Sequence, residues 1–422
     1  MRVHVIGAGL AGLSAAVALA ARGIPVELSE AAAQAGGRCR SYHDARLGMV
    51  IDNGNHLVLS GNAAVGRYLR AIGAEDRLTG PARPDFAFLD LRSGEDWTLR
   101  PNAGPLPWWV LHPGRRVPGT QPRDYLALAA LTRRHPGQRI GEVLACRGPL
   151  WERLLQPFLL AALNTEPEEG AADLAGAVIR ETLARGGGAS LPRIAHPSLA
   201  AAFVDPALAR LRQAGATIRL GRRLRGLDLD GERVVALAFA DGTVPLAPED
   251  ALVLAVPPWV AQDLLPGLTA PDTFRAILNG HFRLAPPPGA PRMLGLIGGT
   301  AEWVFAFPDR LSVTVSAADS LLDMETETLT ARLWRDVATA HHLPGPPPPC
   351  RIVKEKRATF AATPAQEARR PPARTRWRNL FLAGDWTATG LPATIEGALR
   401  SGETAAALAQ ALPQRAREAV PA

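Results

Sequence analysis

The sequence predicts an α/β (α+β) fold, in which a Rossmann-like domain is interrupted by a second domain of mixed structure. Two observations lead to this prediction. A strand–helix–strand pattern occupies the N-terminal thirty residues, and regular α/β structure returns near the C-terminus after two irregular blocks rich in proline and turn residues. The length of 422 residues is enough for two or three domains.

The N-terminal segment has the pattern of a βαβ unit. The expected elements are a buried strand, an alanine-rich helix and a second strand, over residues 3–6, 13–22 and 25–30. The turn after the first strand reads Gly7-x-Gly9-x-x-Gly12. In such a turn the first glycine allows the tight bend, the second lets the backbone approach a pyrophosphate, and the third lets the helix pack on the strand. These glycines argue against a signal peptide, so we interpret the segment as mature structure.

Two features downstream favour a bound dinucleotide over an empty glycine-rich turn. Glu30 ends the second strand, about twenty residues after the motif, where an acidic side chain can bind ribose hydroxyls. Gly36-Gly37-Arg38 follows, and the planar guanidinium of Arg38 suits diphosphate oxygens. The N-terminus of the first helix adds N–H groups and the positive end of its dipole.

The C-terminal part again passes from strand to turn to helix. A strand is predicted over residues 379–383 and a helix over residues 395–412. Asp385, after the strand, can hold a ribityl or sugar hydroxyl. The turn at residues 393–395 can point N–H groups at developing negative charge, which a reduced flavin needs near its pyrimidine ring. An ordinary N-cap of the helix is an equally good interpretation of this turn.

The middle of the chain predicts further regular elements and two irregular blocks. The expected helices cover residues 123–134, 149–163 and 207–213. The expected strands cover residues 217–220, 222–228, 233–239 and 250–256, with a hairpin around Asp230-Gly231. The irregular blocks are residues 82–117 and 270–372. We therefore predict a discontinuous nucleotide-binding domain over residues 1–78, 190–262 and 375–422, and an inserted domain over residues 79–189 and 263–374.

Composition and charge exclude several classes of protein. The 47 basic and 40 acidic residues give a net charge of +7, but no basic block or nucleic-acid-binding signature occurs, so no nucleic-acid partner is expected. Attraction to anionic lipid is a second interpretation of this charge. The 3 cysteines are far apart, which excludes a disulfide framework or zinc ribbon and suits a reducing cytosol. No apolar run reaches the about 20 residues of a membrane span, so we expect a cytoplasmic protein.

Together these motifs resemble the flavin-dependent amine oxidase and phytoene desaturase superfamily. The matching segments are residues 3–30, 36–38, 52–56, 252–258 and 380–402. More narrowly, the chain is similar to the squalene-associated FAD-dependent desaturases, which act as hydroxysqualene dehydroxylases in bacterial hopanoid biosynthesis. The segments that carry the narrower similarity are residues 54–62, 163–168, 357–360 and 384–392.

This resemblance implies a Rossmann-like FAD-binding domain with an inserted mixed substrate-binding domain, and FAD as the cofactor. The FAD contacts that it implies, position by position, are Gly7, Ala8, Gly9, Gly12, Glu30, Gly37, Arg38, Leu224, Gly384, Asp385, Ala393, Thr394 and Ile395. It implies hydride transfer to a polyisoprenoid, hydroxysqualene, which becomes squalene, in functional association with squalene or hydroxysqualene synthase-like enzymes. The alternatives are a carotenoid or isoprenoid desaturase and an amine oxidase, although only 3 tyrosines are available for an aromatic substrate cage.

Two side chains are candidate catalytic acids. His56 lies in an Asn-Gly-Asn-His turn expected near the flavin, and an unperturbed pKa of about 6.5 suits a proton donor. Alternatively, His56 orders the turn by hydrogen bonds. We interpret Asp52, in the same turn, as a structural residue. Glu166 follows an apolar helix, where partial desolvation would raise its pKa. The alternative for Glu166 is a solvated helix terminus.

Two further pairs of residues concern the surface. Trp108 and Trp109, followed by two arginines, suit a membrane interface, so peripheral contact with the inner face of the cytoplasmic membrane is one interpretation. Packing within the substrate domain is the other. His341-His342 lacks a partner at metal-ligand spacing, so we interpret the pair as surface residues and expect no metal.

Overall fold

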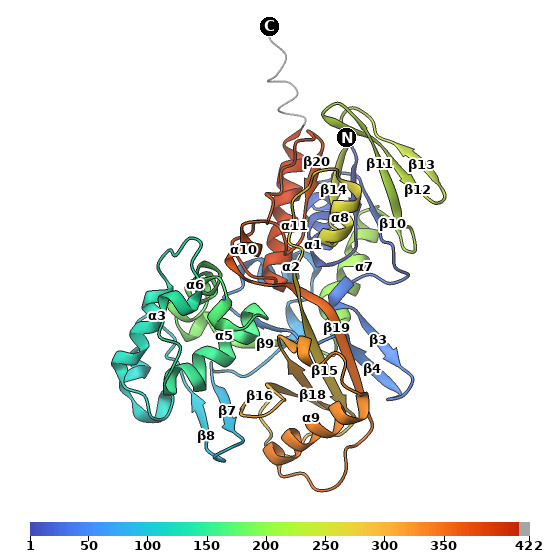
Figure 1. The fold of residues 1–422 in the computed structure, drawn as a ribbon. Coiled ribbons are helices and arrows are strands. Elements are labelled where there is room, and N and C mark those ends of the chain that lie inside the picture. The colour runs from blue at the N-terminus through green and yellow to red at the C-terminus, as the bar shows by residue number, and fades with distance from the viewer. Residues whose placement is uncertain (413–422) are drawn as a thin grey trace.

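The computed structural model describes residues 1–412 (Figure 1). A five-stranded sheet with its helices forms the upper end of the molecule in Figure 1, and a larger, mainly antiparallel sheet lies below it. Helices α3, α5 and α6 form a separate layer at the left of the larger sheet. No helix within this described part of the chain combines the length and apolar character needed to cross a bilayer.

The five-stranded sheet confirms the predicted Rossmann-like core. Its strands pair in parallel, in the order β10-β2-β1-β14-β20. Their bounds are Val3–Ile6 (β1), Val26–Ser29 (β2), Thr217–Arg219 (β10), Ala251–Leu254 (β14) and Leu380–Leu382 (β20). Each was expected, because parallel strands covered on both faces read as short apolar runs between turn residues.

Helices α1 (Leu10–Ala20) and α11 (Ile395–Gln410) pack against each other beside this sheet. Helix α1 begins three residues earlier than predicted, so Gly12 lies in its first turn. A Cβ on Gly402 of α11 would lie 2.2 Å from the backbone oxygen of Ala11. The two helices therefore approach closely only because Gly402 has no side chain. Helices α2 (Ala63–Ile72) and α7 (Asp205–Gln213) complete this layer.

Three smaller sheets and two short helices surround this core. The predicted hairpin is present as β11 (Leu224–Asp230) and β12 (Arg233–Phe239), and β13 (Gly242–Pro245) extends it. The other two sheets are formed by β3 (Ser41–Asp44) with β4 (Met49–Asp52), and by β5 (Leu57–Leu59), β9 (Pro192–Ala195) and β6 (Leu78–Thr79). The short helices are α8 (Pro258–Leu264) and α10 (Pro364–Glu367).

The expectation of two irregular blocks was wrong, because these blocks supply a seven-stranded sheet. Its order is β19-β15-β18-β17-β16-β7-β8. The bounds are Phe86–Asp90 (β7), Asp96–Leu99 (β8), Phe274–Phe282 (β15), Met293–Ile297 (β16), Trp303–Phe307 (β17), Arg310–Val315 (β18) and Cys350–Phe360 (β19). The prolines and glycines that made the blocks look irregular lie mainly between the strands, where turns require them.

The two faces of this sheet meet different partners. Helix α9 (Thr326–His341) covers one face, with its Leu329 and Leu333 in one apolar cluster with the sheet residue Val313. Trp303, Phe305 and Phe307 belong instead to the cluster shared with the helical layer. The helices of that layer are α3 (Leu126–Leu131), α4 (Ile140–Val143), α5 (Gln156–Leu163) and α6 (Ala172–Glu181). Of the two helices expected here, the first is shorter than predicted and the second begins with a π-turn over residues 151–155.

Candidate functional site

The glycine turn has the shape that a pyrophosphate needs. A Cβ on Gly7 would lie 2.3 Å from the backbone oxygen of Ala255, and a Cβ on Gly12 would lie 1.8 Å from that of Gly7. Packing therefore requires both glycines. A Cβ on Gly9 would meet nothing within 4 Å, although Gly9 directly precedes α1. Open space at a helix N-terminus is where phosphate oxygens can bind, so the turn fits the diphosphate of FAD.

Glu30 lies against this turn. Its Oε2 accepts a hydrogen bond of 2.7 Å from the N–H of Ala8, and its Oε1 accepts one of 2.8 Å from Ala32. The backbone N–H of Arg222 binds the carbonyl of Glu30 at 2.8 Å, which brings the start of β11 to the same place. Leu224, the first residue of β11, is buried there. The structure thus brings together the residues that were expected at the adenosine end of FAD.

Arg38 and Asp385 form one ion pair, although 346 residues separate them in sequence. The Arg38 Nη2 lies 2.8 and 2.7 Å from the two Asp385 carboxylate oxygens. Gly36 and Gly37 have φ of 107° and 56°, so the turn that presents Arg38 requires glycines. The N–H of Gly36 binds the carbonyl of Ala8 at 2.8 Å, which places this turn beside the glycine motif. The Arg38 side chain remains 43% exposed and accessible to a phosphate.

The turn at residues 393–395 caps helix α11, and this capping is compatible with a turn that faces a flavin. Thr394 is the N-cap of α11, and its Oγ1 accepts a hydrogen bond of 3.1 Å from Gly397. Ala393 and Thr394 are half-buried, whereas Ile395 is buried. The N–H of Gly384 donates to the Ser401 hydroxyl of α11 at 2.8 Å, so the Gly-Asp turn is held by the same helix. Capping therefore orders the turn and leaves it partly accessible.

Comparison with known proteins decides the family. The model of the family described as "Flavin containing amine oxidoreductase" matches residues 10–409. The chain belongs to this family. It is therefore a flavin-dependent oxidoreductase with FAD as its cofactor.

The similarity to named members of the family covers nearly the whole chain. The protein is 54% identical to hydroxysqualene dehydroxylase of Rhodopseudomonas palustris, over 96% of this chain and 97% of that one. It is 50% identical to hydroxysqualene dehydroxylase of Zymomonas mobilis, over 96% and 98% of the two chains. Cyclohexylamine oxidase from Brevibacterium oxydans shares the fold with a TM-score of 0.70 at 18% identity, over 98% of this chain and 99% of that one.

The turn before β5 lies between the Arg38 region and the seven-stranded sheet. Burial, together with the positive charge of Arg38, lowers the pKa of His56 to about 4, so its imidazole is neutral at pH 7. Asn55 binds the sheet, with its Nδ2 3.0 Å from the Thr314 hydroxyl. The Oδ1 of Asn55 is buried with no hydrogen-bond partner, as an acceptor facing a ligand would be. Asp52 accepts hydrogen bonds from Ser41 and Leu199, in agreement with its structural interpretation.

Glu166 follows α5 as predicted, but its side chain is exposed, so the expected desolvation is not found there. The ordered residue of this loop is Asn164, which has φ of 48°. Its Oδ1 accepts a hydrogen bond of 2.7 Å from the N–H of Ala317, and its Nδ2 donates to the Thr359 hydroxyl at 3.0 Å. The loop that carries Glu166 is therefore fixed to the ends of β18 and β19.

Sequence reasoning missed Glu302. This carboxyl directly precedes β17, and its Oε2 accepts a hydrogen bond of 2.8 Å from the N–H of Ser316. Burial raises the pKa of Glu302 to about 7; the Ser316 N–H opposes this rise, and the negative charge of Glu166 adds to it. The sequence contains no signal for this glutamate. The two causes that raise its pKa are burial and the charge of Glu166, and both depend on how distant parts of the chain fold together.

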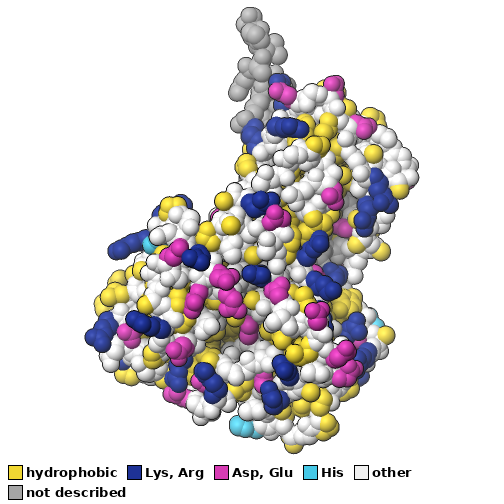
Figure 2. Space-filling model, in the orientation of Figure 1, with side chains coloured by type: hydrophobic (Ala, Val, Ile, Leu, Met, Phe, Trp, Pro, Cys, Tyr) yellow, Lys and Arg dark blue, Asp and Glu magenta, His cyan; other side chains and the backbone are white. Residues whose placement is uncertain are grey.

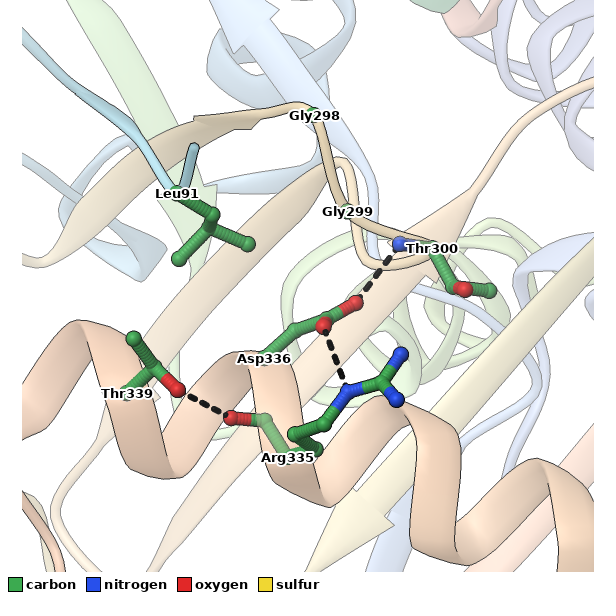
Figure 3. Close-up of a pocket in the computed structure, with 7 residues that line it drawn as sticks. All are labelled: Leu91, Gly298, Gly299, Thr300, Arg335, Asp336 and Thr339. Carbon is green, nitrogen blue, oxygen red and sulfur yellow. Dashed lines mark hydrogen bonds and ion pairs between the residues drawn. The ribbon is translucent and has the colours of Figure 1, made fainter. Parts of the chain in front are cut away.

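Of each remaining pair of predicted surface residues, one member is exposed and the other is at least half-buried. Trp109 is buried, edge-on to Tyr125 with 5.0 Å between ring centroids, whereas Trp108 is 60% exposed. His341 is half-buried and His342 exposed at the end of α9. A cavity of about 490 Å³ lies between α9 and the loop after β16. Figure 3 shows its Asp336 turned toward the N–H of Thr300, a contact of 2.6 Å within the protein itself, and none of the predicted site residues lines it.

Proposed function

We propose that this chain converts hydroxysqualene to squalene by reductive dehydroxylation, as a step of squalene and hopanoid biosynthesis. The observation that carries the proposal is the identity of 50–54% to three hydroxysqualene dehydroxylases along 96% of the chain. Reduced FAD supplies the hydride in this reaction. The protein must bind a long hydrocarbon, keep water away from it, and provide a proton for the departing hydroxyl.

The surroundings of the turn at residues 393–395 support an apolar substrate. Ala393 packs against a continuous hydrophobic cluster that reaches Trp303 and Phe305 of the seven-stranded sheet and the helical layer. A hydrocarbon gains free energy by burial against such side chains and needs few polar contacts. Two of the three tyrosines serve other contacts, since Tyr68 binds the carbonyl of Phe203 and Tyr125 packs on Trp109. This arrangement favours an isoprenoid over an amine.

We also infer how the cofactor and the two domains are arranged. Gly9 and the N-terminus of α1 would accept the diphosphate, Arg38 and Asp385 its ribityl side, and the turn at residues 393–395 the flavin ring. The five-stranded sheet draws its strands from residues 1–78, 190–262 and 375–422, and the seven-stranded sheet draws its strands from residues 79–189 and 263–374. That distribution supports the proposed division into FAD-binding and substrate-binding domains.

The test is an anaerobic single turnover. Protein reduced with dithionite is mixed with hydroxysqualene, flavin reoxidation is followed by absorbance, and the product is identified by mass spectrometry. Squalene formed in step with flavin oxidation is the expected result. Peroxide production from amines with no reaction of hydroxysqualene would instead identify an amine oxidase. Oxidation of an isoprenoid by the oxidised flavin would identify a desaturase.

We propose that the substrate enters from a membrane surface. Trp108 is 60% exposed, and Leu106, Leu111 and Leu126 are 61%, 55% and 69% exposed. Figure 2 shows hydrophobic side chains between arginines over the region of α3. Apolar side chains with nearby arginines favour reversible binding at an anionic bilayer surface. The synthase-like enzyme that makes hydroxysqualene would deliver its product at the same surface, because the molecule is almost insoluble in water.

A further inference from the structure

Glu302 directly precedes β17, and its carboxyl binds the N–H of Ser316 just after β18, at the same end of the seven-stranded sheet as the loop that carries Asn164. A sequence of contacts connects it to Arg38. Ser316 donates its N–H to Glu302, and the next N–H, of Ala317, binds Asn164, which in turn binds Thr359. The guanidinium of Arg38 donates to the carbonyl of the residue before Thr359. Glu302 is therefore positioned by the same strand ends that meet the cofactor-binding residues.

The turn that holds Glu302 is strained. Ala317 has φ of 43°, and its partner Asn164 has φ of 48°. A non-glycine residue costs of order 1–3 kcal/mol in this conformation, and such residues persist where contacts on all sides impose them, often at active sites. Here the strain directs two consecutive N–H groups, one to the Glu302 carboxyl and one to the loop that carries Glu166.

The charges around Glu302 favour retention of its proton. Charged groups on the neighbouring elements are Glu166 on the α5–α6 loop, Asp319 after β18, Arg275 on β15 and Asp336 on α9. Asp336 is engaged by the N–H groups of Thr300 and Ala301, and Asp319 by that of Ala276. Glu166 is the one whose charge raises the pKa of Glu302. By contrast, the neutral imidazole of His56 has no acidic proton to give at pH 7.

We propose that Glu302 is the proton donor of the dehydroxylation, and that Glu166 is a positioning residue whose negative charge keeps the proton on Glu302. This inference rests on the proposed function. The Glu302 proton goes to the hydroxyl oxygen of the substrate as the C–O bond breaks, and water leaves. The carbon accepts a hydride from reduced FAD, which is oxidised by two electrons. The Glu302 carboxylate then takes a proton from solvent.

The ionisation of Glu302 can be measured without substrate. Protein with oxidised FAD and glutamate labelled with ¹³C at the carboxyl carbon is titrated by NMR. One glutamate resonance should titrate at about pH 7 and should be absent from the Glu302→Gln protein. In the Glu166→Gln protein the same resonance should titrate at lower pH, because a neighbouring negative charge has been removed. If all glutamates titrate in the ordinary acidic range, the assignment of Glu302 is wrong.

The donor role is tested by single-turnover flavin oxidation with hydroxysqualene as a function of pH. Because the protonated carboxyl is the active form, the rate should fall as pH rises through about 7. Glu302→Gln should lower the rate about 10²–10⁴-fold and remove this pH dependence. Glu302→Asp should restore part of the rate, and Glu166→Gln should shift the fall to lower pH. Glu168→Gln, an exposed carboxyl on the same loop, is the matched control and should change neither.

Two results would overturn the proposal. One is a Glu302→Gln protein that keeps FAD and the full rate, and the other is a Glu166→Gln protein whose pH profile and NMR titration are both unmoved. If the parent protein does not reduce hydroxysqualene at all, the proposed function and the donor role fail together. An ordinary NMR titration in a protein that does reduce hydroxysqualene would refute the Glu302 assignment alone.

Discussion

Substitution of Gly9 should separate FAD binding from folding. Gly9 has φ of −73° and ψ of 176°, which alanine or valine adopts freely, and a Cβ there would touch no other atom within 4 Å. Gly9→Ala and Gly9→Val should therefore change the free energy of unfolding of the apoprotein by less than about 1 kcal/mol. The added methyl groups would nevertheless occupy the space where the backbone must approach the pyrophosphate. Gly9→Val protein should be colourless.

Gly12→Ala is the matched control, because its methyl group would clash with other atoms of the protein. Its Cβ would lie 1.8 Å from the Gly7 oxygen and 3.2 Å from the Cβ of Ala255. Ordinary van der Waals contact needs at least about 3.4 Å, so α1 would have to move by more than 1 Å relative to β1 and β14. Such overpacking costs about 1–3 kcal/mol or more. Gly12→Ala should thus lose stability and FAD together.

The assay combines flavin absorbance of the purified proteins with urea unfolding of the apoproteins. Gly9→Val protein with full flavin occupancy would show that the diphosphate lies elsewhere. An apoprotein of Gly9→Ala as unstable as that of Gly12→Ala would show that the space above Gly9 is filled by the protein. Either result would refute the reasoning from the glycine turn.

Three further predictions concern the surface, a helix end and a buried histidine. Trp108→Ala should weaken salt-sensitive binding to anionic vesicles with little change in stability, whereas Trp109→Ala should lower the free energy of unfolding by about 3–5 kcal/mol. If the Trp108→Ala and parent proteins sediment equally with vesicles, the exposed surface around Trp108 does not bind the membrane. Glu396 accepts hydrogen bonds of 3.0 Å from two N–H groups at the start of α2, so Glu396→Gln should lower the free energy of unfolding by about 1.5–3 kcal/mol in a urea titration, and an unchanged midpoint would contradict this. Burial and the charge of a nearby arginine lower the pKa of His281 to about 3. The unfolded state therefore binds more protons than the folded state between pH 3 and 6.5, and the free energy of unfolding rises with pH there by at most about 1.4 kcal/mol per pH unit. Urea unfolding of His281→Asn should show a shallower pH dependence than the parent protein, and an equal slope would rule out the histidine as its source.

The nucleotide-binding core could be predicted because its signals are local. Short apolar runs between turn residues indicate buried parallel strands, and the spacing of Gly7, Gly9 and Gly12 belongs to one turn. The ion pair of Arg38 with Asp385 joins residues that the sequence analysis had assigned to the same cofactor. Only its direct contact could not be foreseen, because no local pattern relates the two ends of the chain.

The seven-stranded sheet escaped prediction because polar residues interrupt its strands. Strand β15 contains Asn279 and His281, both buried, and β19 contains Lys354, Glu355 and Lys356. Such residues are typical of loops when read along the chain. In the structure, Asn279 accepts hydrogen bonds from Asn55 and Thr314, so long-range pairing stabilises what local propensity disfavours.

Glu302 escaped prediction for a related reason. Its unusual ionisation depends on burial, on the Ser316 N–H and on Glu166, none of which is near it in sequence. The predicted acid Glu166 lies in the same region but is itself exposed. The sequence pattern pointed to the loop after α5, whereas only the folded arrangement brings the half-buried carboxyl of Glu302 near this loop.

The strand order of the five-stranded sheet has a consequence for the protein during its synthesis. Its central strand β1 can pair with β2 soon after both are made, but its other neighbour β14 follows about 250 residues later, and the edge strand β20 and helix α11 come after residue 379. At about 5–20 residues per second, the ribosome would keep β1 and α1 waiting for many seconds before these partners emerge. The nascent chain therefore carries β1 with one edge unpaired while about 250 residues are added, and the proposed FAD site is complete only after α11 has left the ribosome. We expect low temperature and chaperones to improve the yield of folded protein, whereas added flavin should help only after α11 has been made.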